Sequence, residues 1–210
     1  MELVKIIIID LQDYRELIIK RFNLQKIEND KWIIIHEWNR KSEEWNEKIV
    51  LILCWLWKEN IKKNMEYILE NYIPNKIINL WLSNILNNID LKWWDIIIPN
   101  TFIHSNLEWN GIFLENVSWN NYDLNNFWLI MNWICLSNQE SFIEYKKSTD
   151  FTINNWIDIY DNSAFFILSI AQEKELLENC LVIKWVVELP DNWFKNSVIE
   201  NSVNILELVI

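Results

Sequence analysis

Glycine is nearly absent from this chain, which has a single glycine in 210 residues. Average usage of about 7% would give roughly 15 glycines in a chain of this length. The phosphate-binding pattern Gly-x-x-x-x-Gly-Lys-Ser/Thr and the nucleophile pattern Gly-x-Ser-x-Gly are both missing, even with glycine placed at every tryptophan. These absences argue against a P-loop nucleotide hydrolase and against a serine hydrolase of the α/β class.

Basic residues, long apolar runs and a leader pattern are also lacking. The chain has 19 Lys and Arg against 30 Asp and Glu, a net charge of −11, whereas a nucleic-acid binder needs a basic face. The longest apolar run, Ile49 to Trp57, has nine residues, and a membrane span needs about 20. The first residues show no basic start and no small-residue cleavage site. We therefore expect a cytoplasmic protein that binds neither nucleic acid nor membrane.

Cysteine and histidine are too few and too scattered for a disulfide framework or a metal site. Cys54, Cys135 and Cys180 each fall in an apolar run and form no Cys-x-x-Cys pair, so they are expected to be small buried hydrophobic residues. His36 and His104 are the two histidines, and neither has a second histidine at metal-ligand spacing. We expect no metal and no other cofactor.

Tryptophan is as frequent as glycine should be, with 15 residues. Tryptophan follows asparagine at positions 133, 156 and 193, where the turn dipeptide Asn-Gly would normally stand. We hypothesise that most of these tryptophans are glycines in the natural protein, because its genetic code reads UGA as glycine. The many Ile, Asn and Lys residues, whose codons are AT-rich, fit such a genome. The alternative is a surface that is truly rich in tryptophan.

Apolar runs alternate with amphipathic patterns along the whole chain. Buried strands are predicted over 4–9, 49–54, 77–80, 127–136 and 180–187, and shorter strands over 32–36, 95–99, 101–104, 111–114 and 157–160. Helices are predicted over 13–22, 59–72, 140–147, 163–177 and 195–208. This order favours an α/β three-layer sandwich with a central mixed sheet. No linker or repeat divides residues 1–210, which are therefore predicted to form one domain.

Several segments resemble the nucleoside phosphorylase and nucleosidase superfamily once glycine replaces tryptophan. Residues 91–99, Leu-Lys-Trp-Trp-Asp-Ile-Ile-Ile-Pro, are similar to the family pattern Leu-Lys-x-Gly-Asp-Ile-Val-Ile-Pro, which is the most specific match. Further matches occur in order at 54–58, 76–81, 157–166 and 181–188. The resemblance is to the branch that contains 5′-methylthioadenosine/S-adenosylhomocysteine nucleosidase and futalosine hydrolase. It implies a nucleoside phosphorylase-like fold, a small-molecule nucleoside as ligand and a homodimer.

The resemblance also implies a set of site residues for cleavage of an N-glycosidic bond through an oxocarbenium-like state. Asp161 matches the glutamate that binds the ribose hydroxyls, and Glu188 matches the aspartate that protonates the departing purine. Lys184 matches a nearby arginine in the base site. The remaining matches are Asp13 or Glu16 for the acid that orients water, and Ser137 and Phe142 for the base-binding segment.

Each of these positions departs from the family pattern. Asp161 is one methylene shorter than glutamate and Glu188 is one longer than aspartate, and a carboxylate displaced by about an ångström can lower a rate roughly a hundredfold. Lys184 keeps the positive charge but lacks the bidentate fork of arginine. Leu82 and Ile85 replace small residues whose amides would approach an anion, which disfavours phosphate and favours hydrolysis over phosphorolysis.

Structural roles remain open for the same carboxylates. Asp161 could be a helix N-cap, Glu188 a solvated strand end, and Asp13 and Glu16 ordinary first-turn helix acids. We also expect strand 157–160, its helix and strand 180–187 to form a right-handed β-α-β unit that brings Asp161 and Glu188 to one edge of the sheet.

Three functional hypotheses follow from the sequence. The first is a divergent purine nucleosidase that hydrolyses a nucleoside, for example a 5′-modified one. The second is an inactive relative that binds a nucleoside or serves as a partner subunit. The third is an unrelated doubly wound nucleotide binder, although no dinucleotide-binding fingerprint follows the first strand.

Overall fold

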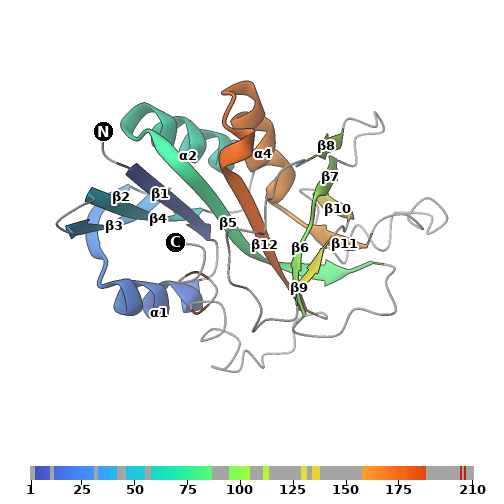
Figure 1. The fold of residues 1–210 in the computed structure, drawn as a ribbon, viewed down its shortest axis with the longest axis horizontal. Helices are drawn as coiled ribbons and strands as arrows, with labels where there is room; N and C mark the ends of the chain where they lie inside the picture. The colour runs from blue at the N-terminus through green and yellow to red at the C-terminus, as the bar shows by residue number, and fades with distance from the viewer. Residues whose placement is uncertain are drawn as a thin grey trace.

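The central feature of the fold is a mixed sheet with helices on both faces (Figure 1). A computed structural model of the chain describes residues 3–9, 12–30, 33–41, 46–54, 58–86, 95–104, 111–113, 129–131, 134–137, 158–187, 204 and 206. Helix α1 (Gln12–Phe22) covers one face, and helices α2 (Lys58–Asn71) and α4 (Ala164–Glu173) cover the other. The prediction of an α/β three-layer sandwich with a central mixed sheet is confirmed.

The described part of the sheet has 12 strands. In chain order they are β1 (Leu3–Ile9), β2 (Gln25–Asp30), β3 (Ile33–Lys41), β4 (Asn46–Cys54), β5 (Pro74–Ile85), β6 (Ile96–Ile98), β7 (Thr101–His104), β8 (Gly111–Phe113), β9 (Leu129–Met131), β10 (Ile134–Ser137), β11 (Ile159–Asp161) and β12 (Cys180–Val187). Strands β4, β1, β5 and β12 run parallel to one another, and β3 and β2 extend them with antiparallel pairing. Past β5 the sheet continues through β11, β10, β7 and β8.

Strand β5 joins the two halves of this sheet. Its first residues pair in parallel with β1, most of its length pairs in parallel with β12, and Asn84 and Ile85 at its end pair antiparallel with β11. A strand with neighbours on both edges and helices on both faces is expected to be almost uniformly apolar. Asn79 and Ser83 are the buried polar residues of β5, and both lie at the candidate site described below.

Two apolar layers hold the helices against the sheet. Ile6 and Ile8 of β1 pack in the layer that contains residues of α2 and α4, whereas Ile7 and Ile9 pack in the layer that contains residues of α1. Successive side chains of a strand point to opposite faces, so a run of four isoleucines serves both layers at once. This is the physical reason why the first strand shows no alternation of polar and apolar residues.

The structure departs from the predicted elements in several places. The strand predicted over 127–136 is wrong as a single strand, because β9 pairs with β6 whereas β10 pairs with β7 and β11. Strand β2 was not predicted, since its polar sequence lies at the edge of the sheet. Helix α4 ends at Glu173, and a 3-10 turn at Leu177–Asn179 leads into β12. The helices predicted over 140–147 and 195–208 lie outside the described residues, except for helical residues 204 and 206.

Two helices end with a residue in the left-handed region, where glycine is usual. Asn23 after α1 has φ 49° and Glu175 after α4 has φ 58°. The amide of Leu24 then donates to the carbonyl of Ile19 at 2.9 Å, and the equivalent bond closes α4. Among the described residues, these two left-handed positions are therefore held by asparagine and glutamate rather than by tryptophan.

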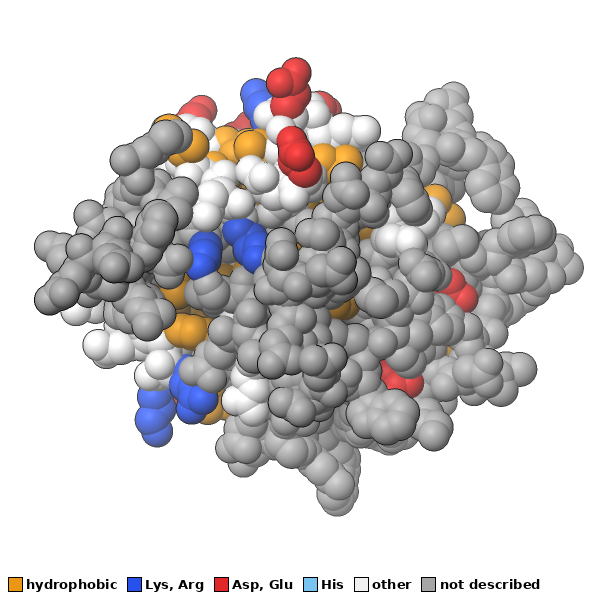
Figure 2. All heavy atoms as spheres, viewed as in Figure 1, with side chains coloured by type: hydrophobic (Ala, Val, Ile, Leu, Met, Phe, Trp, Pro, Cys, Tyr) orange, Lys and Arg blue, Asp and Glu red, His pale blue; other side chains and the backbone are white. Residues whose placement is uncertain are grey.

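The surface features of the described residues are modest. Within the described ranges, no helix is long and apolar enough to cross a membrane. On the face drawn in Figure 2, the Lys and Arg side chains of these residues lie in separate small groups, with acidic side chains near one of them.

Candidate functional site

The strands that carry the candidate site meet at the end of β5. Asn84 of β5 is aligned with Tyr160 of β11 on one side and with Val187 of β12 on the other. The predicted parallel β-α-β crossover is wrong, because β11 runs antiparallel to β5 whereas β12 runs parallel to it. The two strands nevertheless flank the same residue. Because β11 runs against β5, Asp161, the residue after Tyr160, lies back along β5 toward Ser83, which is aligned with Val186 of β12.

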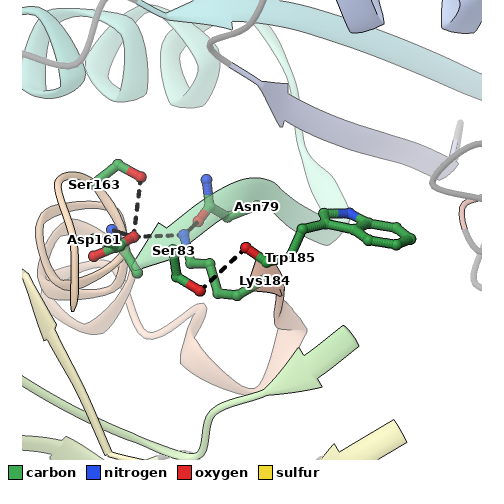
Figure 3. Close-up of polar contacts among 7 residues, drawn as sticks. Asn79, Ser83, Asp161, Ser163, Lys184 and Trp185 are labelled. Carbon is green, nitrogen blue, oxygen red and sulfur yellow. Dashed lines mark hydrogen bonds and ion pairs between the residues drawn. The ribbon is translucent and has the colours of Figure 1, made fainter. Parts of the chain in front are cut away.

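A buried ion pair forms the centre of the site (Figure 3). Lys184 of β12 places its Nζ atom 2.5 Å from Oδ2 of Asp161, and both side chains are fully buried. The same ammonium donates a hydrogen bond to Oδ1 of Asn79 at 2.7 Å. The three side chains come from three different strands of the same sheet, β5, β11 and β12. Lys184 thus binds one carboxylate and one amide in a region that excludes water.

The same carboxylate also accepts the first amide of helix α4. Oδ2 of Asp161 accepts the backbone amide of Ala164 at 3.0 Å and the hydroxyl of Ser163 at 3.4 Å. Asp161 stands at the start of the helix, where exposed amides and the helix dipole favour a negative charge. The N-cap residue of α4 is Ser163, so the N-cap role that the sequence left open for Asp161 is wrong in position, although the Asp161 carboxylate does accept the first helical amide. Asp161 combines this contact with the ion pair to Lys184.

The burial of Asp161 and Lys184 requires that both charged groups have good partners. Moving two ions out of water is costly, and their attraction offsets that cost only when the geometry is good and further hydrogen bonds satisfy the charged groups. Here the carboxylate oxygen has a lysine, a hydroxyl and an amide as partners, and the lysine has a second acceptor in Asn79. These contacts therefore fix the positions of both charged side chains. A polar ligand group can bind to them only if it reaches their buried atoms.

Ser137 is the other predicted site residue that the structure places near Asp161. It ends β10 and is aligned with Asp161 in β11 and with His104 in β7. These three strands are parallel to one another, so all three residues stand at their carboxyl ends, where ligands bind in open α/β sheets. The ring of His104 lies 5.0 Å from the ring of Phe166 and 5.5 Å from that of Phe165, measured between centroids.

The remaining predicted residues are not joined to this cluster by the described contacts. Asp13 and Glu16 lie on α1, which packs on the opposite face of the sheet from α4, and Glu16 is exposed. Glu188 and Phe142 lie outside the described residues. The structure therefore brings together Asp161, Lys184 and the position of Ser137.

Sequence reasoning missed two polar partners of the ion pair, Asn79 and Ser163. It also proposed neither His104, which is aligned with Ser137, nor Ser83, which donates its hydroxyl to the carbonyl of Trp185 at 3.3 Å. A signal was available for two of them, because Asn79 and Ser83 interrupt an otherwise apolar buried strand. Buried polar side chains require partners, so such an interruption indicates a buried network. In the described ranges, no group of three or more His, Cys, Asp or Glu side chains could hold a metal.

Two tryptophans flank the cluster on opposite faces of the sheet. Trp81 is aligned with Lys184 across β5 and β12, and Trp185 follows Lys184 in β12. The indole of Trp185 points away from the ion pair (Figure 3) into the layer that contains α1. Its N–H group is buried and has no hydrogen-bond partner. A buried tryptophan usually finds an acceptor for this group, so the position is poorly suited to its residue.

Comparisons with known proteins show the class of fold. No protein-family model and no curated protein sequence matches this chain. Solved structures do match over nearly the full length, and their names include nucleosidases and a futalosine hydrolase. The chain shares the fold of these nucleosidases and of futalosine hydrolase, so the fold implied by the resemblance in the sequence is confirmed.

Three of these structures show how similar the folds are. The 5′-methylthioadenosine/S-adenosylhomocysteine nucleosidase of Campylobacter jejuni has a TM-score of 0.75 at 15% identity, covering 99% of this chain and 96% of its own. The futalosine hydrolase of Helicobacter pylori has a TM-score of 0.74 at 13% identity, covering 100% and 96%. A mutant nucleosidase of Helicobacter pylori, with 5′-methylthioadenosine in its active site, has a TM-score of 0.73 at 12% identity, covering 99% and 97%.

Proposed function

We propose that this protein is a divergent purine nucleosidase that hydrolyses the N-glycosidic bond of a nucleoside, for example a 5′-modified one. The observation that carries the proposal is the meeting of Asp161, Lys184 and the position of Ser137 at one place in a fold shared with nucleosidases. These residues come from separate strands, and sequence resemblance had assigned all three to the nucleoside site. The proposal needs neither a metal nor another cofactor.

The proposed roles follow the chemistry of the reaction. As the glycosidic bond breaks, positive charge develops on the ribose ring, and a carboxylate that binds the ribose hydroxyls stabilises it. Asp161 takes this role, and Glu188 protonates the departing purine. Val187, the last residue of β12, is aligned with Asn84, whose other neighbour is Tyr160, the residue before Asp161. The further members of the proposed site are Ser137 and Phe142 for the base, and Asp13 or Glu16 for the water.

Hydrolysis is favoured over phosphorolysis by the pairing of β5. A phosphate-binding loop needs backbone amides that are free to point at an anion. Here residues 81–84 continue strand β5 and pair with β12 from Lys184↔Trp81 to Val187↔Asn84. Partly buried Leu82 and Ile85 also pack against the apolar layers of the core. This backbone is committed to the sheet, which leaves water as the favoured acceptor.

The experiment uses the protein expressed with glycine at UGA codons and measures release of free base from methylthioadenosine, adenosylhomocysteine, inosine and futalosine. Glu188→Gln is expected to abolish release while leaving nucleoside binding nearly intact, and Asp161→Asn to weaken both, because contacts to the ribose tighten in the transition state. Glu178→Gln, an exposed acid in the turn before β12, is the matched control and should change neither. Unchanged turnover in Glu188→Gln would place the acid elsewhere.

A second function is favoured by the burial of the ion pair. Both Asp161 and Lys184 are fully buried, and Asp161 already accepts the first amide of α4, so the pair can be a structural remnant in an inactive relative. Such a protein would bind a nucleoside without cleaving it, or would act as a partner subunit. Tight binding without base release from any of the four nucleosides would identify the first case.

A homodimer, which we also propose, would give twice the chain mass in size-exclusion light scattering.

A further inference from the structure

The ion pair that carries the proposed function is closed to solvent in this chain. The side chains of Asp161 and Lys184 are both 0% exposed, so a ribose hydroxyl could not reach the carboxylate. Aligned residues on neighbouring strands place their side chains on the same face of the sheet. Trp81 is aligned with Lys184, and it stands two positions after Asn79, which binds the lysine. The indole of Trp81, itself 9% exposed, therefore lies on the same face as the ion pair.

Independent observations indicate that tryptophan replaces another residue at several places in this chain. Trp185, next to Lys184 on the other face, buries an indole N–H that has no partner. The whole chain holds 15 tryptophans and one glycine, the reverse of ordinary proteins. Glycine inside a strand is typical of a site where a ligand or another backbone approaches closely.

We infer that Trp81 is the cover of the Asp161–Lys184 pair, and that the native protein carries glycine at position 81, which leaves the pair open to a polar ligand. Loss of the indole exposes the face of β5 beside the lysine while the backbone pairing with β12 is kept. Position 81 thereby determines whether the site accepts a ligand. The identity of that ligand as a nucleoside rests on the proposed function, whereas the covering role does not.

The test of the covering role is chemical labelling of Lys184. An amine-reactive acylating reagent is applied to the unaltered chain, to Trp81→Gly and to Trp185→Gly, and each lysine is quantified by peptide mass spectrometry. Lys62, whose side chain is 68% exposed, is the internal reference. Trp81→Gly should raise the labelling of Lys184 at least about tenfold, because a buried group otherwise reacts only after local opening. Trp185→Gly removes the same side chain from the opposite face and should leave Lys184 protected.

The remaining outcomes separate the parts of the inference. Equal labelling of Lys184 in the unaltered chain and in Trp81→Gly would overturn the covering role. Equal labelling of Lys184 in Trp81→Gly and in Trp185→Gly would overturn it as well. If Trp81→Gly does not fold, Trp81→Ala removes the same ring and is held to the same criterion. Tryptophan at position 81 in peptides from the source cells would overturn the native glycine. Adenosine binding by Trp81→Gly, measured by calorimetry, tests the proposed function alone, since Lys184 can become reactive without it.

Discussion

Removal of the lysine from the buried ion pair is expected to destabilise the protein strongly. In Lys184→Met the side chain keeps a similar length and apolar stem, but Asp161 is left as a fully buried carboxylate without its cation. The amide oxygen of Asn79 also loses the donor that lies 2.7 Å away. Breaking a buried pair by deleting one partner typically costs about 3–5 kcal/mol, because the remaining charge is uncompensated.

Urea denaturation gives the measurement. With a urea dependence of about 2 kcal/mol per molar, a loss of about 3–5 kcal/mol lowers the midpoint by roughly 1.5–2.5 M. The matched control is Lys62→Met, which breaks an i,i+4 pair with Glu66 at 3.8 Å, whose side chains are 68% and 51% exposed. Exposed pairs of this kind contribute about 0.3–0.5 kcal/mol, so the control midpoint should hardly move.

The double variant Asp161→Asn with Lys184→Met distinguishes a charge effect from a packing effect. It removes both charges, so the loss should be smaller than in Lys184→Met alone. A loss below about 1 kcal/mol in Lys184→Met would refute the reasoning, because that value is typical of a solvated surface pair. A double variant that is less stable than Lys184→Met would show that packing rather than charge dominates at this place.

Other groups in the structure yield three further expectations. Burial, and secondarily the charge of Lys5, lowers the pKa of half-buried Lys76 from 10.5 to about 8. Between pH 8 and pH 10.5 the unfolded chain binds more protons than the folded protein, so the free energy of unfolding should rise with pH. After allowance for solvent screening the rise is about 1 kcal/mol, and Lys76→Met should lack it in urea titrations. Burial raises the pKa of the Cys180 thiol to about 12, so iodoacetamide at pH 8 should label it only in unfolding concentrations of urea. Glu175→Gly relieves a left-handed residue at φ 58° and should raise the urea midpoint by a stability gain of about 0.5–1 kcal/mol.

Local pattern predicted most of the secondary structure. The isoleucine run of β1 and the apolar run of β12 are too uniform for a surface element, and both proved to be central strands. The helical pattern of 59–72 and the proline after it were sufficient for α2, since Pro74 begins the next strand. Prediction failed for β2, whose polar sequence resembles a loop, and for 127–136, where two short strands with different partners read as one apolar run.

The candidate site was predicted in part, for a different reason. Asp161 and Lys184 were assigned to one site by resemblance, and they do meet. The parallel crossover that was expected to bring Asp161 and Glu188 to one sheet edge is wrong, because β11 and β12 run in opposite directions along β5. Asn79 was overlooked because nothing in the order of residues along the chain says which strand pairs with which. The buried polar residue in an apolar strand was the available signal, and it required a partner that only the sheet could supply.

The sequence by itself determined the class of fold, the two apolar layers and the positions of most strands and helices, because these depend on periodicity that neighbouring residues carry. Only the tertiary structure decided that β11 runs against β5, that Asp161 accepts the first amide of α4 while it binds Lys184, and that Trp81 shares a face with the pair. Strand pairing and burial arise between residues far apart in the chain. Their free energies are set by which surfaces meet in the folded molecule, and no local pattern records that choice.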